Sequence, residues 1–219
     1  MYDPLDISEY SFEEIKAAAD EAKRWNTYLA VHTYTDPGTQ AAIKAGAKTL
    51  EHCNLLTDET VKMAVKNDCY ISAQTGVHLS PAPDSFTPAQ KARQQQAAEG
   101  LDNLMKLCKK YKAKVLFGAD MVGSLENKRL HLTEFTNRTK WFSNAEILKQ
   151  ATSMNGEVLA LSGPRNPYPG KLGVIEEGAL ADLLLINGNP LEDISILLKP
   201  EENLALIMKD GKIYKNITD

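Results

Sequence analysis

The sequence predicts an α/β protein in which parallel strands alternate with helices, and two observations carry this prediction. Short apolar runs that are typical of buried strands alternate with segments of helical periodicity as far as residue 120, in the order βαβαβαβ. Three of these runs end in a potential metal ligand, namely His32, His52 and Asp120. Because parallel α/β folds place their chemistry at the carboxyl ends of strands, the same pattern predicts an active site.

The individual elements follow from local signals. Capping boxes predict helix starts at Ser11, Thr87 and Ser143, and Asp36, followed by a proline, predicts another helix that ends at Gly46. Up to residue 161 the expected elements are helix 11–26, strand 27–32, helix 36–46, strand 48–52, helix 57–67, strand 69–74, loop 75–86, helix 87–111, strand 114–120, helix 127–140 and helix 143–161.

The composition changes after residue 161. Residues 162–170 are rich in proline and glycine and predict a linker, beyond which strands are expected at 173–175, 181–187, 204–208 and 212–214. Asp210-Gly211 is typical of a tight hairpin turn. We therefore predict two domains, a barrel portion at residues 1–163 and a small β domain at residues 164–219.

The predicted architecture leaves surfaces uncovered. Four parallel strands flanked by helices amount to half of a (β/α)8 barrel, whose outer strands and inner face would be exposed to water. We therefore expect a homo-oligomer, or a complementing chain that covers the open barrel edges.

The composition excludes several classes of protein. The chain has 219 residues, of which 43% are hydrophobic, and a net charge of −4, so neither a membrane span nor a basic surface for nucleic acid is expected. The start of the sequence lacks the features of a signal peptide, which predicts a cytoplasmic location. The three cysteines, Cys53, Cys69 and Cys108, form no C-x-x-C pair, which favours reduced thiols.

The sequence resembles a known family around the same strand ends. Val31-His32-Thr33-Tyr34-Thr35, Thr49-Leu50-Glu51-His52 and Phe117-Gly118-Ala119-Asp120 resemble the stretches around barrel strands five, six and eight of metal-dependent amidohydrolases. Residues 172–184 resemble the return into the small β-sandwich of these enzymes. The likeness is to the Xaa-Pro dipeptidase-like and imidazolonepropionase-like branch and covers nearly the whole chain. It implies a partial TIM barrel, strands five to eight, followed by part of a composite β-sandwich.

The resemblance also implies a reaction. It implies a hydrolase that cleaves C–N bonds of a small amide or dipeptide substrate with a metal-activated hydroxide. His32 and His52 would then be imidazole ligands of a divalent metal, zinc by preference, and Asp120 a ligand and catalytic acid/base. Imidazole and carboxylate are donors that suit zinc. The His-x-His pair of strand one and the lysine of strand four of the family have no counterpart in this sequence.

Two further residues are candidates for substrate binding. Tyr34 lies two residues beyond His32, where a hydroxyl could hold a substrate carboxylate; packing in the loop is the alternative. His78 follows the strand at 69–74 and could face the same site; a solvated loop histidine is the alternative. Two rival functions stay open, a catalytically inactive fragment or pseudoenzyme, and one half of a split enzyme. The sequence does not name the substrate.

Overall fold

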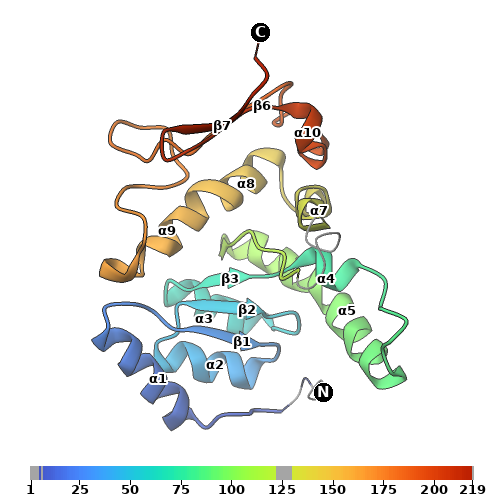
Figure 1. Cartoon of the computed structure of the whole chain (residues 1–219). Helices are drawn as coiled ribbons and strands as arrows, with labels where there is room; N and C mark the ends of the chain where they lie inside the picture. Colours follow the sequence, from blue (N-terminus) through green and yellow to red (C-terminus); the bar gives the residue numbers. More distant parts are fainter. Residues whose placement is uncertain (1–4, 6, 122–129, 219) are drawn as a thin grey trace.

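The computed structural model describes residue 5, residues 7–121 and residues 130–218, and these residues form two sheets with surrounding helices (Figure 1). The parallel sheet has the order β1-β2-β3-β4, and the antiparallel sheet has the order β5-β6-β7. The strands are β1 Ala30–Thr33, β2 Thr49–His52, β3 Tyr70–Ser72, β4 Lys114–Val115, β5 Leu183–Ile186, β6 Leu204–Lys209 and β7 Lys212–Asn216. The described residues also form the α-helices α1 Phe12–Arg24, α2 Asp36–Ala45, α3 Asp58–Lys66, α4 Thr75–Leu79, α5 Pro88–Tyr111, α7 Thr133–Asn137, α8 Asn144–Lys149, α9 Asn155–Ala160 and α10 Pro200–Asn203.

The predicted α/β class is confirmed, and the local signals explain most helix starts. The predicted capping boxes at Ser11, Thr87 and Ser143 are all present. Gly46 ends α2 in a left-handed conformation with φ of 107°, which glycine adopts without strain. The predicted N-cap of α2 is one residue too late, because Thr35 takes that place. The Asp36 carboxylate instead accepts a hydrogen bond from the Thr57 N–H at 2.9 Å.

The loop predicted at residues 75–86 is partly wrong, because α4 forms one helical turn at its start. The Glu134 carboxylate accepts a hydrogen bond from the Gly76 N–H at 2.5 Å, which satisfies a donor that a helix start leaves free. Glu134 is distant in sequence, so no local pattern reports this contact.

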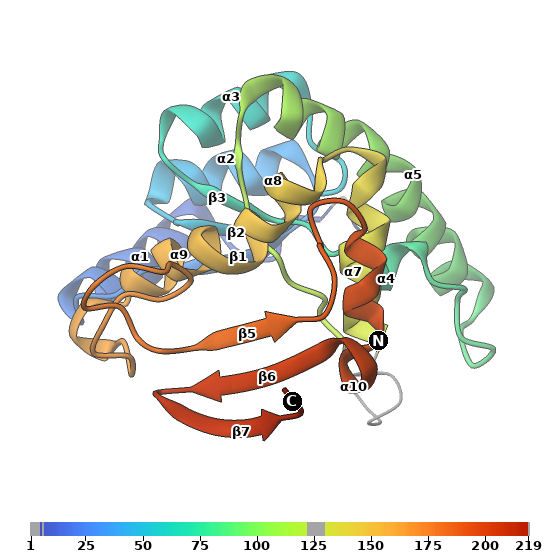
Figure 2. The same cartoon turned by 90° about the horizontal axis from the view of Figure 1, so that it is seen from above.

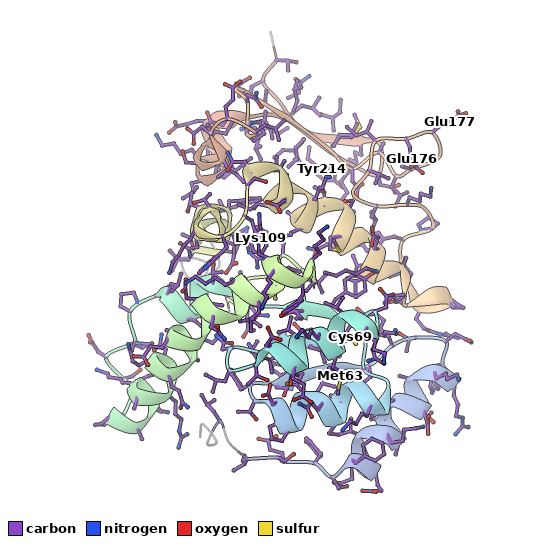
Figure 3. All side chains as sticks on the ribbon, turned by 180° about the vertical axis from the view of Figure 1, so that it is seen from behind. Met63, Cys69, Lys109, Glu176, Glu177 and Tyr214 are labelled. Carbon is purple, nitrogen blue, oxygen red and sulfur yellow. The ribbon has the colours of Figure 1, made fainter. Side chains whose placement is uncertain are left out.

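The strand predicted at residues 173–175 is wrong. This segment forms no strand, and Ile175 is 92% exposed. The nearest pairing is a single bridge between Lys171 and Ala179. Figure 3 shows Glu176 and Glu177 on a loop that stands out from the molecule. The other predicted C-terminal strands are present, and the Asp210-Gly211 turn joins β6 to β7 with positive φ at both residues.

The strand predicted at residues 114–120 is much shorter in the structure. Lys114 and Val115 pair with β3, and the last backbone hydrogen bond between the two runs from the Leu116 N–H to the Ile71 carbonyl at 2.9 Å. Beyond them the Asn155 side chain takes the place of a neighbouring strand. It accepts from the Phe117 N–H at 3.1 Å and donates to the Phe117 carbonyl at 2.8 Å. These two bonds hold the backbone that leads to Asp120.

The main core lies between the parallel sheet and the helices α2, α3 and α5. Its strand residues are joined by helix residues that are fully buried, such as Ala42, Val61 and Leu104. Ile194 and Leu197, from the segment before β6, belong to the same core, so the part of the chain beyond residue 164 packs directly on the part before it. Figures 1 and 2 show α8 and α9 between the two sheets. None of the described helices is long and apolar enough to cross a membrane.

A buried ion pair ties α7 to the parallel sheet. Arg138 and Glu134 are both completely buried and lie 2.9 Å apart. The Arg138 guanidinium also donates to the carbonyls of Ala73 and Leu116, at 2.8 and 2.9 Å, and to Gln150 Oε1 at 2.9 Å. Because a buried charge is tolerated only when it is paired and hydrogen-bonded, this network holds the helix firmly against the strand ends.

We expect the Asn155→Ala variant to lose about 1 to 3 kcal/mol of unfolding free energy, because it leaves the Phe117 backbone groups unpaired. Alanine is the better helix former, so any loss comes from the missing bonds. Urea unfolding would measure the change. The control is Asn67→Ala, whose exposed side chain makes one bond within its own helix end, and which should change stability by less than about 0.5 kcal/mol. Equal effects of the two changes would contradict the role of Asn155.

Candidate functional site

The candidate site starts from a row of polar side chains across three strands. Residues that are paired across β1, β2 and β3 form rows along the sheet. The row of Val31, Leu50 and Ile71 faces the helices and the core. The next row is His32, Glu51 and Ser72, which are neighbours on β1, β2 and β3. Because successive residues of a strand point to opposite faces, this second row projects away from the helices. It forms the polar surface of the sheet near the strand ends.

His52 joins this row through an unusual backbone conformation. It follows Glu51 on β2, so a regular strand would turn its ring toward the helices. His52 and Cys53 instead have positive φ angles of 69° and 61°. The helix α5 supports this turn: Asn54 donates to the Ala97 carbonyl at 2.9 Å, and a Cβ at Gly100 would lie only 2.3 Å from the Asn54 carbonyl oxygen. Non-glycine residues with positive φ are uncommon and mark strained, often functional, positions.

The structure brings the two predicted histidine ligands into contact. His32 Nδ1 lies 2.6 Å from His52 Nε2. The other nitrogen of His52, Nδ1, lies 2.9 Å from Gln74 Oε1, and an amide oxygen can only accept, so Nδ1 carries the proton. The lone pair of His52 Nε2 therefore points toward His32. A hydrogen bond of this kind is how proteins set the tautomer of a metal-binding imidazole.

Tyr34 and His78 enclose His52 from two sides. The Tyr34 ring stacks on the His52 ring with centroids 4.8 Å apart and an angle of 3° between the planes. His78 meets the His52 ring edge-on at 6.0 Å and the Tyr34 ring edge-on at 6.4 Å. His78 is buried, so the alternative of a solvated loop histidine does not hold. Both residues predicted to bind substrate are thus part of one aromatic cluster with His52.

Asp120 stands apart from the histidine pair. It is exposed and has a positive φ of 51°, which ends the extended segment after β4. Its charge still acts on His52, whose pKa it raises in opposition to stronger effects. No group of three potential ligands lies within metal-binding range among the described residues. The structure therefore pairs His32 with His52 and leaves Asp120 as a neighbour.

The buried imidazoles are held in the neutral form. Burial, assisted by the nearby His32, lowers the pKa of His52 below its usual range. Burial and the neighbouring His52 lower the pKa of His78 to about 4. Neutral imidazole is the form that binds metals, because the lone pair is then free. Cys53, in contrast, is buried with its pKa raised well above the usual range, so it is an inert thiol.

The sequence did not identify two residues of the site, Gln74 and Glu51. Gln74 orients His52 and donates to Ser72 Oγ at 3.1 Å, and it lies 3.5 Å from a carboxylate oxygen of Glu51. Gln74 stands just beyond β3, so the same rule of strand ends could have identified it. Glu51 precedes His52 inside a strand, and only the register of the sheet reveals that it shares a face with His32.

The chain belongs to the amidohydrolase family, whose profile matches residues 7–214. Ochratoxinase of Aspergillus niger is 28% identical over 216 residues, which are 97% of this chain and 43% of that protein. A crystal structure of an amidohydrolase aligns with a TM-score of 0.89 and 31% identity, over 99% of this chain and 51% of that one. A prolidase complexed with N-methylphosphonate-L-proline aligns with a TM-score of 0.85 and 27% identity, over 98% of this chain and 51% of that one.

These comparisons confirm the predicted family and the predicted partial coverage. The chain spans about half the length of the curated relatives that it matches. The assignment of its strands to positions five to eight of a barrel, the β-sandwich and the division at residue 163 stay predictions. The same holds for the roles of His32, His52 and Asp120.

The depressed pKa of His78 predicts a loss of stability in mild acid. An unfolded histidine takes up a proton near pH 6.5, whereas folded His78 does so only near pH 4. Stability is therefore complete above pH 6.5 and falls as the pH drops toward 4. At pH 5.5 His78 alone should remove roughly 1.4 kcal/mol. Urea unfolding at pH 7.5 and 5.5 should show a smaller loss in His78→Phe than in the unchanged protein, and equal losses would contradict the assignment.

Proposed function

We propose that this chain supplies one part of the active site of an enzyme that hydrolyses amide bonds in small, dipeptide-like substrates. The observation that carries the proposal is the contact between His32 and His52 at the carboxyl ends of neighbouring parallel strands. Membership of the amidohydrolase family supports the reaction class. The prolidase and the ochratoxinase among the relatives favour a small amide or dipeptide as the substrate.

The two histidines fit a divalent metal by their chemistry. Both are imidazoles, and the lone pair of His52 Nε2 is directed at His32 because Gln74 holds the opposite nitrogen. Two nitrogens do not complete the four-coordinate shell that zinc prefers. We infer that Asp120 is a further ligand and that other ligands come from outside the described residues. A bound metal would polarise the amide carbonyl and lower the pKa of a water molecule.

The protein's own groups then have distinct roles. Asp120 is exposed near His52, where its carboxylate can accept a proton from water and return it to the leaving amine. Tyr34 stacks on His52 and carries a hydroxyl that can hold a substrate carboxylate. His78 closes the cluster on another side and excludes water from the His52 ring. Glu51 places a negative charge in the same row and favours a cation there.

Two alternatives predict different behaviour of the purified protein. A catalytically inactive fragment or pseudoenzyme would keep the fold and show neither metal nor turnover. One half of a split enzyme would become active only when a complementing chain or a second copy is present. The exposed edge of β1, which pairs only with β2 among the described strands, favours such a complement.

Metal analysis of three variants would test the proposed function. We expect His32→Asn and His52→Asn to lower zinc affinity by about 10- to 100-fold or more, and Asp120→Asn to abolish dipeptide hydrolysis with a smaller loss of metal. Elemental analysis and competition with a chelator measure the first effect, and release of the free amino acid measures the second. His131→Asn is the control, since that exposed histidine lies outside the cluster. Full metal content in His52→Asn would overturn the ligand assignment.

A further inference from the structure

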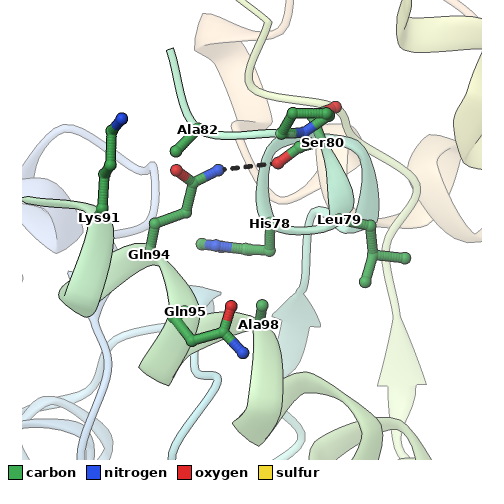
Figure 4. A pocket seen from close by; sticks show the side chains of 9 residues that line it. His78, Leu79, Ser80, Ala82, Lys91, Gln94, Gln95 and Ala98 are labelled. Carbon is green, nitrogen blue, oxygen red and sulfur yellow. Dashed lines mark hydrogen bonds between the residues drawn. The ribbon is translucent and has the colours of Figure 1, made fainter. Parts of the chain in front are cut away.

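A pocket beside the histidine cluster is not explained by the proposed reaction. It has a volume of about 320 Å³ and lies between α4 with its following loop and one face of α5 (Figure 4). His78, Lys91 and Gln94 are among its polar lining residues. Pockets that bind small organic molecules have volumes in this range and a few fixed polar groups.

Two buried polar atoms in this pocket have no hydrogen-bond partner among the described residues. They are Nε2 of His78 and Oε1 of Gln94. His78 is 6% exposed. Figure 4 shows the Gln94 amide lying across from the His78 ring. Because a buried polar atom without a partner destabilises the folded protein, such a pair marks a place where a ligand or an ordered water completes the bonding.

The orientation of Gln94 is set by the protein. Its Nε2 donates to the carbonyls of Val77 and Ser80, at 3.2 and 3.0 Å. With both bonds in place, Oε1 is the atom left for the pocket, and it can only accept a hydrogen bond. The pocket therefore requires a donor from its occupant. A carboxylate offers none, so it would face the Gln94 oxygen without a bond.

The charge of the pocket also limits the class of ligand that can bind there. Lys91 lines it with an ammonium group, which disfavours a cationic occupant. The neutral His78 ring can donate from Nε2 to a carbonyl oxygen. A carboxamide provides both halves of the required pattern, since its N–H can bond to Gln94 and its oxygen can bond to His78.

We propose that the pocket between α4 and α5 is a binding site for a neutral group with a hydrogen-bond donor, best matched by a carboxamide. The rings of His78 and His52 are perpendicular, with their centroids 6.0 Å apart, so an occupant that contacts His78 lies close to the histidine pair. The proposal does not depend on the proposed function, because binding can be measured without turnover and without metal.

Three probes of nearly equal shape would test the proposal. Benzamide has a donor and an acceptor, acetophenone has a neutral acceptor alone, and benzoate has a charged acceptor alone. We expect benzamide to bind about 5- to 100-fold more tightly than acetophenone, with benzoate weaker than benzamide. Calorimetry measures the affinities, and the imidazole signals of ¹⁵N-labelled protein report whether His78 is the group contacted.

Two variants test whether Gln94 is the residue that distinguishes benzamide from acetophenone. Gln94→Leu should bring the ratio of benzamide to acetophenone affinity to about one, whereas Gln96→Leu, on the exposed side of the same helix, should keep it. Equal affinity for the three probes in the unchanged protein, tighter binding of benzoate, or benzamide binding that leaves the His78 signals unmoved would each overturn the proposal. No binding of any probe would show that the pocket holds only ordered water.

Discussion

The parallel register of β1, β2 and β3 determines where the polar side chains of the candidate site lie. Each strand places a hydrophobic residue toward the helices and the following polar residue on the opposite face, so one pairing produces both the core and the site. A shift of one residue on any strand would bury Glu51 or Ser72 against the helices and expose Leu50 or Ile71. The burial of the core therefore keeps the site in register.

In a regular strand the His52 ring would face the helices. The left-handed backbone at His52 and Cys53 turns the ring toward His32 instead. Left-handed conformations at His52 and Cys53 are unfavourable by about 1 to 3 kcal/mol each. The surrounding contacts offset this: the Gln74 bond and the stacked Tyr34 ring hold the imidazole, and α5 packs closely on the residue that follows the turn. Asp120 also has a positive φ. Two of the family's three expected ligands, His52 and Asp120, thus have a left-handed backbone conformation, whereas His32 lies in ordinary strand backbone.

The buried ion pair of Arg138 and Glu134 fixes the ends of β3 and β4. Arg138 donates to the carbonyls of Ala73 and Leu116, which lie just beyond the last paired residues of β3 and β4. These carbonyls have no strand partner there, so the guanidinium replaces one. Its partner Glu134 accepts from the Gly76 N–H and so fixes the start of α4, which carries His78. One buried ion pair thus connects the end of the sheet, the helix of His78 and the residue next to Gln74.

The sequence predicts those parts of this arrangement that depend on neighbouring residues, and it misses those that depend on distant ones. His32 and His52 were identifiable because their position after an apolar run is a local property. The left-handed turn at His52 was not, because histidine has no preference for it and the supporting helix lies more than forty residues away. The short β4 has the same explanation. The last bond to β3 is made by the Leu116 N–H, and at Phe117 the backbone is held instead by Asn155, whose side chain belongs to a helix. The extent of β4 therefore depends on a side chain about forty residues further along the chain, which the apolar run itself does not report.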